Sequence, residues 1–534
     1  MDIQDALKQE PQHIQDSPVV QAMLNLIQKQ NEQIQTQTEQ ISKLNKTIDE
    51  LKNEISRLNK TPKRPKFKPN KIEPRKRGKS STPSSKNEKN ICVPNKKREE
   101  IKVLAEGVPK NSRFKGYSKF KVQDLDIAVK DITYKLEVWI TPEGKVIRGQ
   151  LPQEVRGKHF GANLRALVIN LYAQGMTQPA IHDFLKGVGI KISSGQISHI
   201  FLDEAEKFSE VSEAILEAGL NEAPYIRTDD TGARHNHKNA YCTHIGGEHF
   251  AYYKTAFSKS RANFLSILLQ GKSAYRINDA MIWHLFQCGV KDDILNLFET
   301  HKGKKYASQQ GLKRFFANLH LRGKKLQAQC TEAAAVGFIA EEILREGQVL
   351  LSDRAGQFAV FDHAGCWVHM ERPLRKIISS SSSVQNEVEE VRNAIWQLYR
   401  KLKKAALTQT GRKEVEKKYD ALLAMNSTSP AITAVLNGFR QFREEMLKAL
   451  DHPGLPLHNN ASEGDIREFV KRRKISGSTK SEKGRKFRDG LVTLKKTCFR
   501  LGLSFWEYSL QWFQGNPLDL AQLVRNRYQE AALP

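Results

Sequence analysis

Three acidic residues, far apart in the chain, occupy positions where a carboxylate would lie at the end or the beginning of a secondary-structure element. Asp229 follows the predicted strand 225–228, Asp353 follows the apolar run 349–352, and Glu463 lies in the first turn of a predicted helix. Hard cations such as Mg²⁺ bind a few carboxylates together with water and phosphate oxygens. Two such cations can activate an attacking oxygen and stabilise a leaving oxygen. If the three acids converge, they predict metal-assisted phosphoryl transfer.

The segments around these acids predict an α/β fold. Period-two alternation and short apolar runs bounded by turn residues indicate strands at 225–228, 238–245, 248–254, 349–352 and 365–370. A helix is expected from Ser260. Consecutive strands followed by a helix suit a sheet that exposes a carboxylate near a strand end.

The helix that carries Glu463 is predicted from HNNASEGDIREFVKRRKISGS, residues 458–478. Asn460 or Ser462 suits its N-cap, because a short polar side chain accepts a hydrogen bond from a free backbone N–H. The helix ends in four consecutive basic residues, 471–474. Together with Arg372 and Arg467 these predict phosphate contacts beside the acids. A solvated charged face is the alternative interpretation.

The composition indicates a polyanionic partner. The 534 residues include 86 Lys and Arg against 59 Asp and Glu, a formal charge of +27, which favours nucleic acid. No apolar run approaches the ~20 residues that cross a membrane, and the N-terminus lacks a signal sequence, so a soluble, unexported protein is expected. The six cysteines are far apart and form no C-x-x-C pair, which fits a reducing cytoplasm and argues against a zinc ribbon or a disulfide framework.

The N-terminal region predicts a dimer. From Val20 to Leu58 apolar residues recur in heptads with Val or Ile at a and Leu at the last d positions, which favours a parallel two-stranded coiled coil at 19–60. A single helix packed on a globular domain is the alternative. Residues 61–110 combine Pro, Ser and many basic side chains, and are expected to be a disordered linker that either touches DNA phosphates or is a solubilising tether.

Two small modules follow the linker. Residues 111–157 predict a hairpin about Pro142-Glu143-Gly144, with no legible function. Residues 158–220 predict helices with a tight connection, the pattern of a helix-turn-helix domain whose last helix enters the major groove. Any small helical bundle has a similar pattern, so that alternative stays open.

The blocks TDDTGARHNHKNAYCTHI, LLSDRAGQF with GCWVHMERPLRKI, and HNNASEGDIREFVKRRKISGS resemble the three blocks of the transposases of the insertion sequence 66 family, part of the DDE group. The resemblance implies an RNase H-like mixed sheet with flanking helices. It also implies that Asp229, Asp353 and Glu463 are the catalytic residues and bind two Mg²⁺ or Mn²⁺ ions. Asp230 takes a neighbouring position that is commonly Glu and is not the primary ligand.

The resemblance further implies DNA strand cleavage at the element ends and transfer of the 3′-OH to target DNA. DNA contacts are expected from Arg372, Asn459, Asn460, Arg467, Lys471, Arg472, Arg473 and Lys474. Family members often carry a cysteine-rich zinc segment after the basic linker. Only Cys92 lies nearby here, so no zinc is expected. The expected partners are element and target DNA, a second copy in a synaptic assembly and accessory proteins of the same element, in the cytoplasm at the nucleoid.

The expected domain organisation combines these segments. The domains are an N-terminal tail 1–18, coiled coil 19–60, linker 61–110, β-containing module 111–157, helix-turn-helix-like domain 158–220, catalytic domain 221–515 with helical insertions at 276–346 and 384–450, and a C-terminal tail 516–534.

Other interpretations of the same residues remain. The tripeptide His235-Asn236-His237 spells the name of a nuclease motif, but a true site of that type spreads its residues over a hairpin and a helix. Cys366 and His369 could begin a metal site, yet no second pair follows, and a buried strand with a satisfied histidine is the default. A non-catalytic dimeric DNA-binding protein and a metal-dependent nuclease without joining activity are the two alternative functions.

Overall fold

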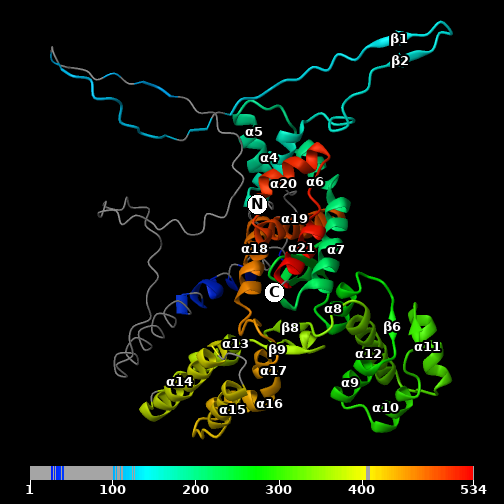
Figure 1. Ribbon diagram of the computed structural model, residues 1–534, viewed down its shortest axis with the longest axis vertical. Helices are drawn as coiled ribbons and strands as arrows, with labels where there is room; N and C mark the ends of the chain where they lie inside the picture. The colour runs from blue at the N-terminus through cyan, green and yellow to red at the C-terminus, as the bar shows by residue number, and fades with distance from the viewer. Residues whose placement is uncertain are drawn as a thin grey trace. The chain divides into compact units, whose positions relative to one another are not determined.

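The computed structural model describes most of the chain from residue 100 onward and a few residues before it (Figure 1). The described residues are 18, 26–27, 29–30, 32–37, 39–40, 100–102, 104, 109, 112–122, 124–125 and 127–532 without 380 and 405–408. Those between 26 and 40 are helical, in agreement with a helix there, while the rest of the expected coiled coil and nearly all of the linker 61–110 lie outside the described residues. The dimer therefore stays a prediction.

The chain divides into two compact units. One comprises Met1–Pro83, Lys376–Val391 and Ser427–Ser429; the other comprises Ser84–Arg375, Arg392–Asn426 and Pro430–Pro534. The second unit holds every strand that the structure describes, together with the three acids.

The centre of the second unit is a five-stranded mixed sheet, which confirms the α/β class. The strands are β3 (Tyr225–His235), β4 (Lys238–Gly246), β5 (Ala251–Ala256), β8 (Val349–Ser352) and β9 (His363–Gly365). Their order across the sheet is β5-β4-β3-β8-β9. The β3, β4 and β5 strands are antiparallel neighbours, whereas β8 and β9 run parallel to β3.

The hairpin β3–β4 corrects the first predicted strand, which was expected to stop before Asp229. The strand continues to His235, because β4 pairs with it from Arg227 onward. Asn236 and His237 make the two-residue connection with φ of 46° and 61°, the left-handed values that a twisted two-residue hairpin turn requires. Asp229 therefore lies within a long strand rather than at its end.

The outer edge of the sheet is closed by one helix. Three backbone N–H groups of β5, at Ala251, Tyr253 and Thr255, donate to Thr497 Oγ1, Thr493 Oγ1 and Asp489 Oδ2 at 3.3, 3.1 and 2.8 Å. These acceptors lie four residues apart along α19 (Glu482–Leu501), so one helix face matches every second residue of the strand. Side chains thus satisfy an edge that would otherwise be open to strand addition.

The predicted strand 365–370 is wrong. The strand β9 ends at Gly365, and Trp367–Glu371 form the short helix α13. A short apolar run does not distinguish a strand from a buried helix, and here Trp367, Glu371 and Leu374 recur at helical spacing on the buried side.

The helices before the sheet share its core. They are α4 (Ala162–Gln174), α5 (Gln178–Gly187), α6 (Ser194–Leu202) and α7 (Ala205–Glu222). Thr177 caps α5, and Ser193 with Gln196 forms a capping box at α6, as the sequence suggests. Phe201 stacks on Phe487 of α19 with ring centroids 5.0 Å apart. The predicted helices are present, and their contact with DNA stays a prediction.

Helices also fill the two expected insertions and the C-terminal part. Between β5 and β8 lie α8 (Arg261–Leu268), β6 (Tyr275–Arg276), α9 (Asp279–Gln287), α10 (Asp292–Glu299), β7 (Lys305–Tyr306), α11 (Gln309–Asn318) and α12 (Lys324–Glu342). After α13 come α14 (Ser382–Lys404), α15 (Gln409–Leu423), α16 (Pro430–Gln441), α17 (Arg443–Leu447), α18 (Asn460–Ser476), α19, α20 (Phe505–Gln514) and α21 (Leu520–Ala532). Met281, Phe298, Leu312 and Phe316 belong to a separate small core of the first insertion. None of the described helices is long and apolar enough to cross a membrane.

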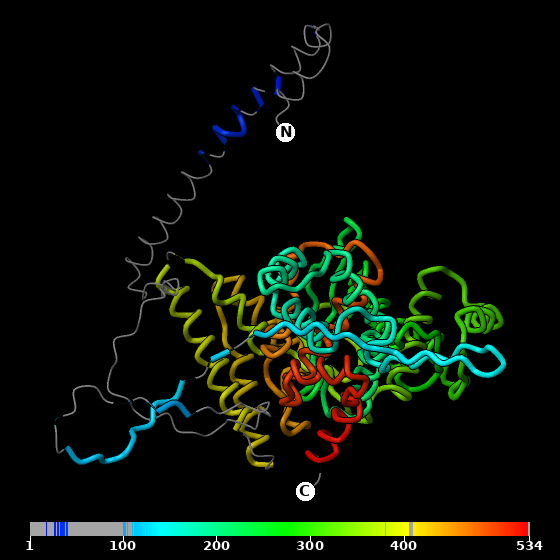
Figure 2. Tube along the Cα trace, turned by 90° about the horizontal axis from the view of Figure 1, so that it is seen from above, coloured from blue at the N-terminus to red at the C-terminus, as the bar shows by residue number. Residues whose placement is uncertain are grey.

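The segment that precedes α4 has a different character. Residues 138–140 (β1, Val138–Ile140) and 146–148 (β2, Val146–Arg148) form an antiparallel ribbon about the predicted turn. Figure 2 draws this cyan segment as two extended stretches joined at a turn. All described residues from 112 to 150 are exposed except Thr141, so the ribbon has no core of its own.

Candidate active site

The parallel pair β3–β8 aligns the first two acids. The register pairs Tyr225 with Val349 and Arg227 with Leu351. Asp229 and Asp353 each lie two residues beyond the last of these pairs, Asp229 within β3 and Asp353 just after β8, so both follow the same end of the paired segment. A backbone N–H fixes one oxygen of each carboxylate: Asp230 N donates to Asp229 Oδ1 at 2.8 Å, and Ala355 N donates to Asp353 Oδ1 at 3.0 Å.

The N-terminus of α18 is tied to the strand that carries Asp229. Asn459 Nδ2 donates to the carbonyl oxygen of Thr228 at 2.8 Å, and Asn459 N donates to Cys366 Sγ at 3.3 Å. Asn459 occupies the N-cap position, but its side chain makes no capping hydrogen bond. The expected cap at Asn460 or Ser462 is therefore wrong. An asparagine before Glu463 instead anchors the helix to β3, one residue from the first aspartate.

A buried charge network holds the inner face of α18. Asp465 is paired with Arg500, with Lys496 at 3.7 Å and with His244 Nε2 at 3.3 Å. Burial raises the pKa of Asp465, but the hydrogen bond and charge of His244, together with Arg500, outweigh burial and hold that pKa well below its usual value. Since His244 belongs to β4, this network fastens the helix to the sheet two residues after Glu463.

Other acids act on the ionisation of Asp229. Burial, followed by the negative charge of Asp353, raises the pKa of Asp229 to about 7. The Asp230 N–H opposes this shift, while the charges of Asp230 and Glu463 add to it. Like charges disfavour ionisation only when they are close. This agrees with the pairing of β3 with β8 and with the Asn459–Thr228 hydrogen bond, which tie the three segments to one another.

Both carboxylate oxygens of Asp230 accept hydrogen bonds from other side chains. Its Oδ1 accepts from Thr243 Oγ1 and its Oδ2 accepts from Gln357 Nε2, both at 2.7 Å. Burial raises the pKa of Asp230 despite these two hydrogen bonds, which lower it. With both oxygens engaged by protein groups, Asp230 is a poorer cation ligand than Asp229.

Two arginines and a histidine lie close to Glu463. Its Oε1 lies 2.9 Å from Arg372 Nη2 and 3.4 Å from His369 Nε2, and its Oε2 lies 3.9 Å from Arg467 Nη2. His369 Nδ1 is buried without a hydrogen-bond partner. Burial, followed by the positive charge of Arg372, lowers the pKa of His369. The negative charges of Asp353 and Glu463 oppose this shift without reversing it. Sequence reasoning treated His369 as a satisfied strand residue and missed it, because only the helix α13 turns it toward the acids.

The donor set fits a hard divalent cation, with one qualification from the geometry. Carboxylate oxygens of two aspartates on adjacent segments are the ligands that Mg²⁺ prefers. Within the part of the chain that the structure describes, however, no three His, Cys, Asp or Glu side chains are close enough to enclose a metal ion. The carboxylate of Glu463 instead pairs with Arg372 and His369.

Comparison with known proteins agrees with this architecture. The sequence model of the IS66 family of transposases matches residues 346–486, a range that contains Asp353 and Glu463. The uncharacterized protein y4jO of Sinorhizobium fredii (strain NBRC 101917 / NGR234) is 37% identical over 298 residues, which are 55% of this chain and 93% of that protein. The chain belongs to the IS66 transposase family. The resemblance read from the three sequence blocks is confirmed.

In this IS66 family chain the exposed face of α18 continues from the acid into a basic stripe. Glu463, Arg467, Lys471 and Lys474 are spaced by four, four and three residues, so they share one helix face. The three basic side chains are exposed. Arg372, which pairs with Glu463, and Asn460 are exposed as well.

Three predicted DNA contacts have other roles in the structure. Asn459 is fully buried and anchors α18. Arg472 is 6% exposed, with its guanidinium 4.0 Å from the centre of the Tyr172 ring. Arg473 donates to the carbonyl oxygen of Gly232 in β3. A run of four basic residues on a helix points in all directions, and only part of it can face a ligand.

The tripeptide 235–237 has a structural role. Asn236 and His237 form the hairpin turn, and His235 is buried with its Nδ1 2.8 Å from Thr479 Oγ1. The three side chains do not form a nuclease site spread over a hairpin and a helix. The tripeptide ends β3 and makes the turn to β4.

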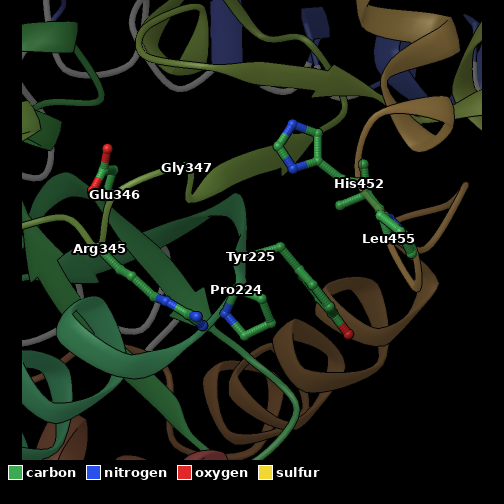
Figure 3. Close-up of a pocket in the computed structure, with 8 residues that line it drawn as sticks. Pro224, Tyr225, Arg345, Glu346, Gly347, His452 and Leu455 are labelled. Carbon is green, nitrogen blue, oxygen red and sulfur yellow. The ribbon is translucent and has the colours of Figure 1, made fainter. Parts of the chain in front are cut away.

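A cavity of about 200 Å³ lies at the opposite end of the two parallel strands (Figure 3). Pro224 and Tyr225 at the start of β3, Arg345 to Gly347 before β8, and His452 to Leu455 line it. His452 Nε2 lies 3.3 Å from Asp362 Oδ2. Since the acids lie at the carboxyl end of β8, this cavity is not their site.

Proposed function

We propose that this chain is a DDE-type transposase that cleaves DNA at the ends of its element and joins the resulting 3′-OH to target DNA. Family membership supports a role in transposition. The observation that supports the catalytic proposal is geometric: Asp229 lies in β3, Asp353 follows the parallel strand β8, and Asn459 ties the helix of Glu463 to Thr228 of β3. Acids from two strands and a helix, separated by more than a hundred residues each, have no evident structural need to meet.

The sheet is proposed to be an RNase H-like core. In support, three antiparallel strands are followed by two parallel ones, with the central strand β3 carrying the first acid. The second acid follows the adjacent parallel strand, and the third lies on a helix packed on the sheet. This is the arrangement that the resemblance of the three blocks implies.

Asp229, Asp353 and Glu463 are the residues that would hold two Mg²⁺ or Mn²⁺ ions. When bound, such ions lower the pKa of an attacking hydroxyl or water and neutralise the leaving oxygen. The chain contributes fixed carboxylates, held by the N–H groups of Asp230 and Ala355. The exposed residues Arg372, Arg467, Lys471 and Lys474 are proposed to bind the phosphates on both sides of the reacting bond.

The remaining partners are proposed from the net charge and from the sequence pattern. The charge of +27 favours element and target DNA as ligands. The helices α4 to α6 are proposed to read the element end, and the heptads of 19–60 to join two copies. Action at the nucleoid in the cytoplasm, with accessory proteins of the same element, completes the proposal.

The decisive experiment replaces each acid by its amide. Asp229→Asn, Asp353→Asn and Glu463→Gln should each reduce cleavage and joining by at least about 100-fold, because each removes a charge aimed at the reacting centre. Binding of an element-end duplex in a gel-shift assay should be retained. Glu468→Gln, five residues along the same helix and paired with Lys495, is the matched control and should keep activity. Full activity in all three amide variants would exclude the carboxylate mechanism.

Cleavage and joining separate the remaining alternatives. A purified protein that nicks a labelled element end in Mg²⁺ but never transfers it to a plasmid is a nuclease. Binding without nicking identifies a DNA-binding protein that has lost or never had catalysis. The proposed transposase yields both the nicked end and the joined product, in that order of appearance.

A further inference from the structure

The arm, defined as residues 112–150, exposes more apolar surface than any other part of the described chain. Fifteen large apolar side chains between Phe114 and Ile147 are 41–91% exposed, against eight in the described residues from 151 to 532. At roughly 100 Å² each they present on the order of 1,500 Å². The largest apolar patch of an ordinary monomer is about 300–600 Å². The arm therefore has the surface of an interface.

Both faces of the ribbon carry this surface. In β1 the consecutive residues Val138, Trp139 and Ile140 are all exposed, and neighbours in a strand point to opposite faces. Across the ribbon Trp139 pairs with Ile147, and Ile140 pairs with Val146. Strands that are apolar on both faces are normally covered on both. A two-stranded hairpin is also marginally stable without such cover.

The ribbon half of the arm, residues 124–150, is close to neutral, whereas residues 112–123 carry four basic side chains and no acidic one. Between residues 124 and 150 there are four basic side chains and five acidic ones, although the whole chain carries +27. A segment that contacts phosphates needs an excess of Lys and Arg. The ribbon half of the arm is nearly neutral and apolar, which is the composition of a protein interface core.

We propose that the arm packs on a second copy of this chain, with the two arms exchanged reciprocally. Two arms together offer on the order of 3,000 Å², within the ~2,000–5,000 Å² that obligate homodimers bury. A two-fold exchange uses the same patch twice and needs no other protein. The arm also lies between the predicted coiled coil and α4, so a coiled-coil dimer would hold each arm at millimolar effective concentration near its partner.

The test is a site-specific photocrosslink in the full-length protein. A photoreactive phenylalanine analogue is placed at position 147, in the arm, and in a control protein at position 283, since Trp283 is exposed to 60% outside the arm. After irradiation, position 147 should yield a covalent dimer on a denaturing gel at least ten times more efficiently than position 283. Peptide mapping should locate the crosslink on the second unit or on the arm of the partner copy.

The substitution Trp139→Ser sharpens the test. It should reduce the covalent dimer from position 147 at least tenfold, whereas Trp283→Ser should leave it unchanged. Crosslinks found only within one chain would mean that the arm folds back on its own body and would overturn the proposal. Equal dimer yields from both positions, or crosslinks only to added DNA, would overturn it too. None of these outcomes depends on the catalytic acids, so a failed transposition assay leaves the inference standing.

Discussion

Two hairpins of this chain, β1–β2 and β3–β4, are built from similar residues and have opposite environments. The first is exposed along both strands, while Ala233, Cys242 and Ile245 in the second are buried. Both have a turn with positive φ, at Gly144 in one and at Asn236 with His237 in the other. The difference lies in what covers them: α18 and α19 pack on β3–β4, and no described segment covers β1–β2. The local sequence is enough to form a hairpin in both places, but only the covered hairpin β3–β4 positions residues of the candidate active site.

The largest expected effect comes from breaking the network that fastens α18 to β4. Asp465→Asn leaves Arg500 and Lys496 without their buried counter-charge. Removing one partner of a buried pair costs about 3–5 kcal/mol. Urea unfolding should show this loss, whereas Glu530→Gln, at an exposed pair with Arg527, should change stability by less than ~1 kcal/mol. Equal effects would mean that the buried network does not anchor the helix.

The next effect separates anchoring from capping. Asn459→Ala removes the hydrogen bond to Thr228 O inside a buried site and should cost about 1–3 kcal/mol. Because the tether positions Glu463, cleavage should fall further than the loss of folded protein explains. Asn460→Ala, at the exposed neighbour, is the matched control for stability. A larger effect at 460 would restore Asn460 as the helix cap.

The third prediction uses the pH dependence of Asp229. Its pKa of about 7 in the folded protein lies above the ordinary 3.8, so between these values the folded state holds a proton that the unfolded state has lost. Stability must then fall as pH rises from about 4 to 7. Asp229→Asn removes this loss and should stabilise the metal-free protein by about 1–2 kcal/mol at pH 8, less at pH 5. Melting curves at both pH values, without and with Mg²⁺, test it. A stabilisation independent of pH would show that ionisation of Asp229 does not destabilise the folded protein.

The smallest effect concerns the two turns. His237 adopts φ of 61°, a value that glycine reaches without strain, so His237→Gly should stabilise the protein by roughly 0.5 kcal/mol. In the arm the reverse change, Gly144→Ala, strains a turn at φ of 77°. If the arm is covered only in a dimer, Gly144→Ala should lower the midpoint of unfolding at high protein concentration and leave it unchanged at low concentration. A concentration-independent loss would place the arm within the monomer core.

The elements that carry Asp353 and Glu463 could be predicted from the sequence, because each is formed by residues adjacent in the chain. The apolar run before Asp353 and the helical spacing after Glu463 each describe an element on their own, and both elements are observed. The errors arose where a neighbour decided the outcome. The strand β3 extends past Asp229 because β4 pairs with it, and Asn459 anchors rather than caps because Thr228 O is within reach. His369 could not be recognised before α13 brought it to Glu463.

The sequence by itself determined the α/β class and the family, and it predicted the three acids, since these depend on periodicity and on short blocks of adjacent residues. Only the tertiary structure decided that β3 and β8 are parallel neighbours, so that Asp229 and Asp353 follow the same end of the paired strands. It also decided which basic residues of α18 are exposed. The tertiary structure also showed that the hairpin β3–β4 is buried and that the hairpin β1–β2 is exposed. Register and burial depend on contacts between residues more than a hundred positions apart, and no local pattern encodes which of those contacts form.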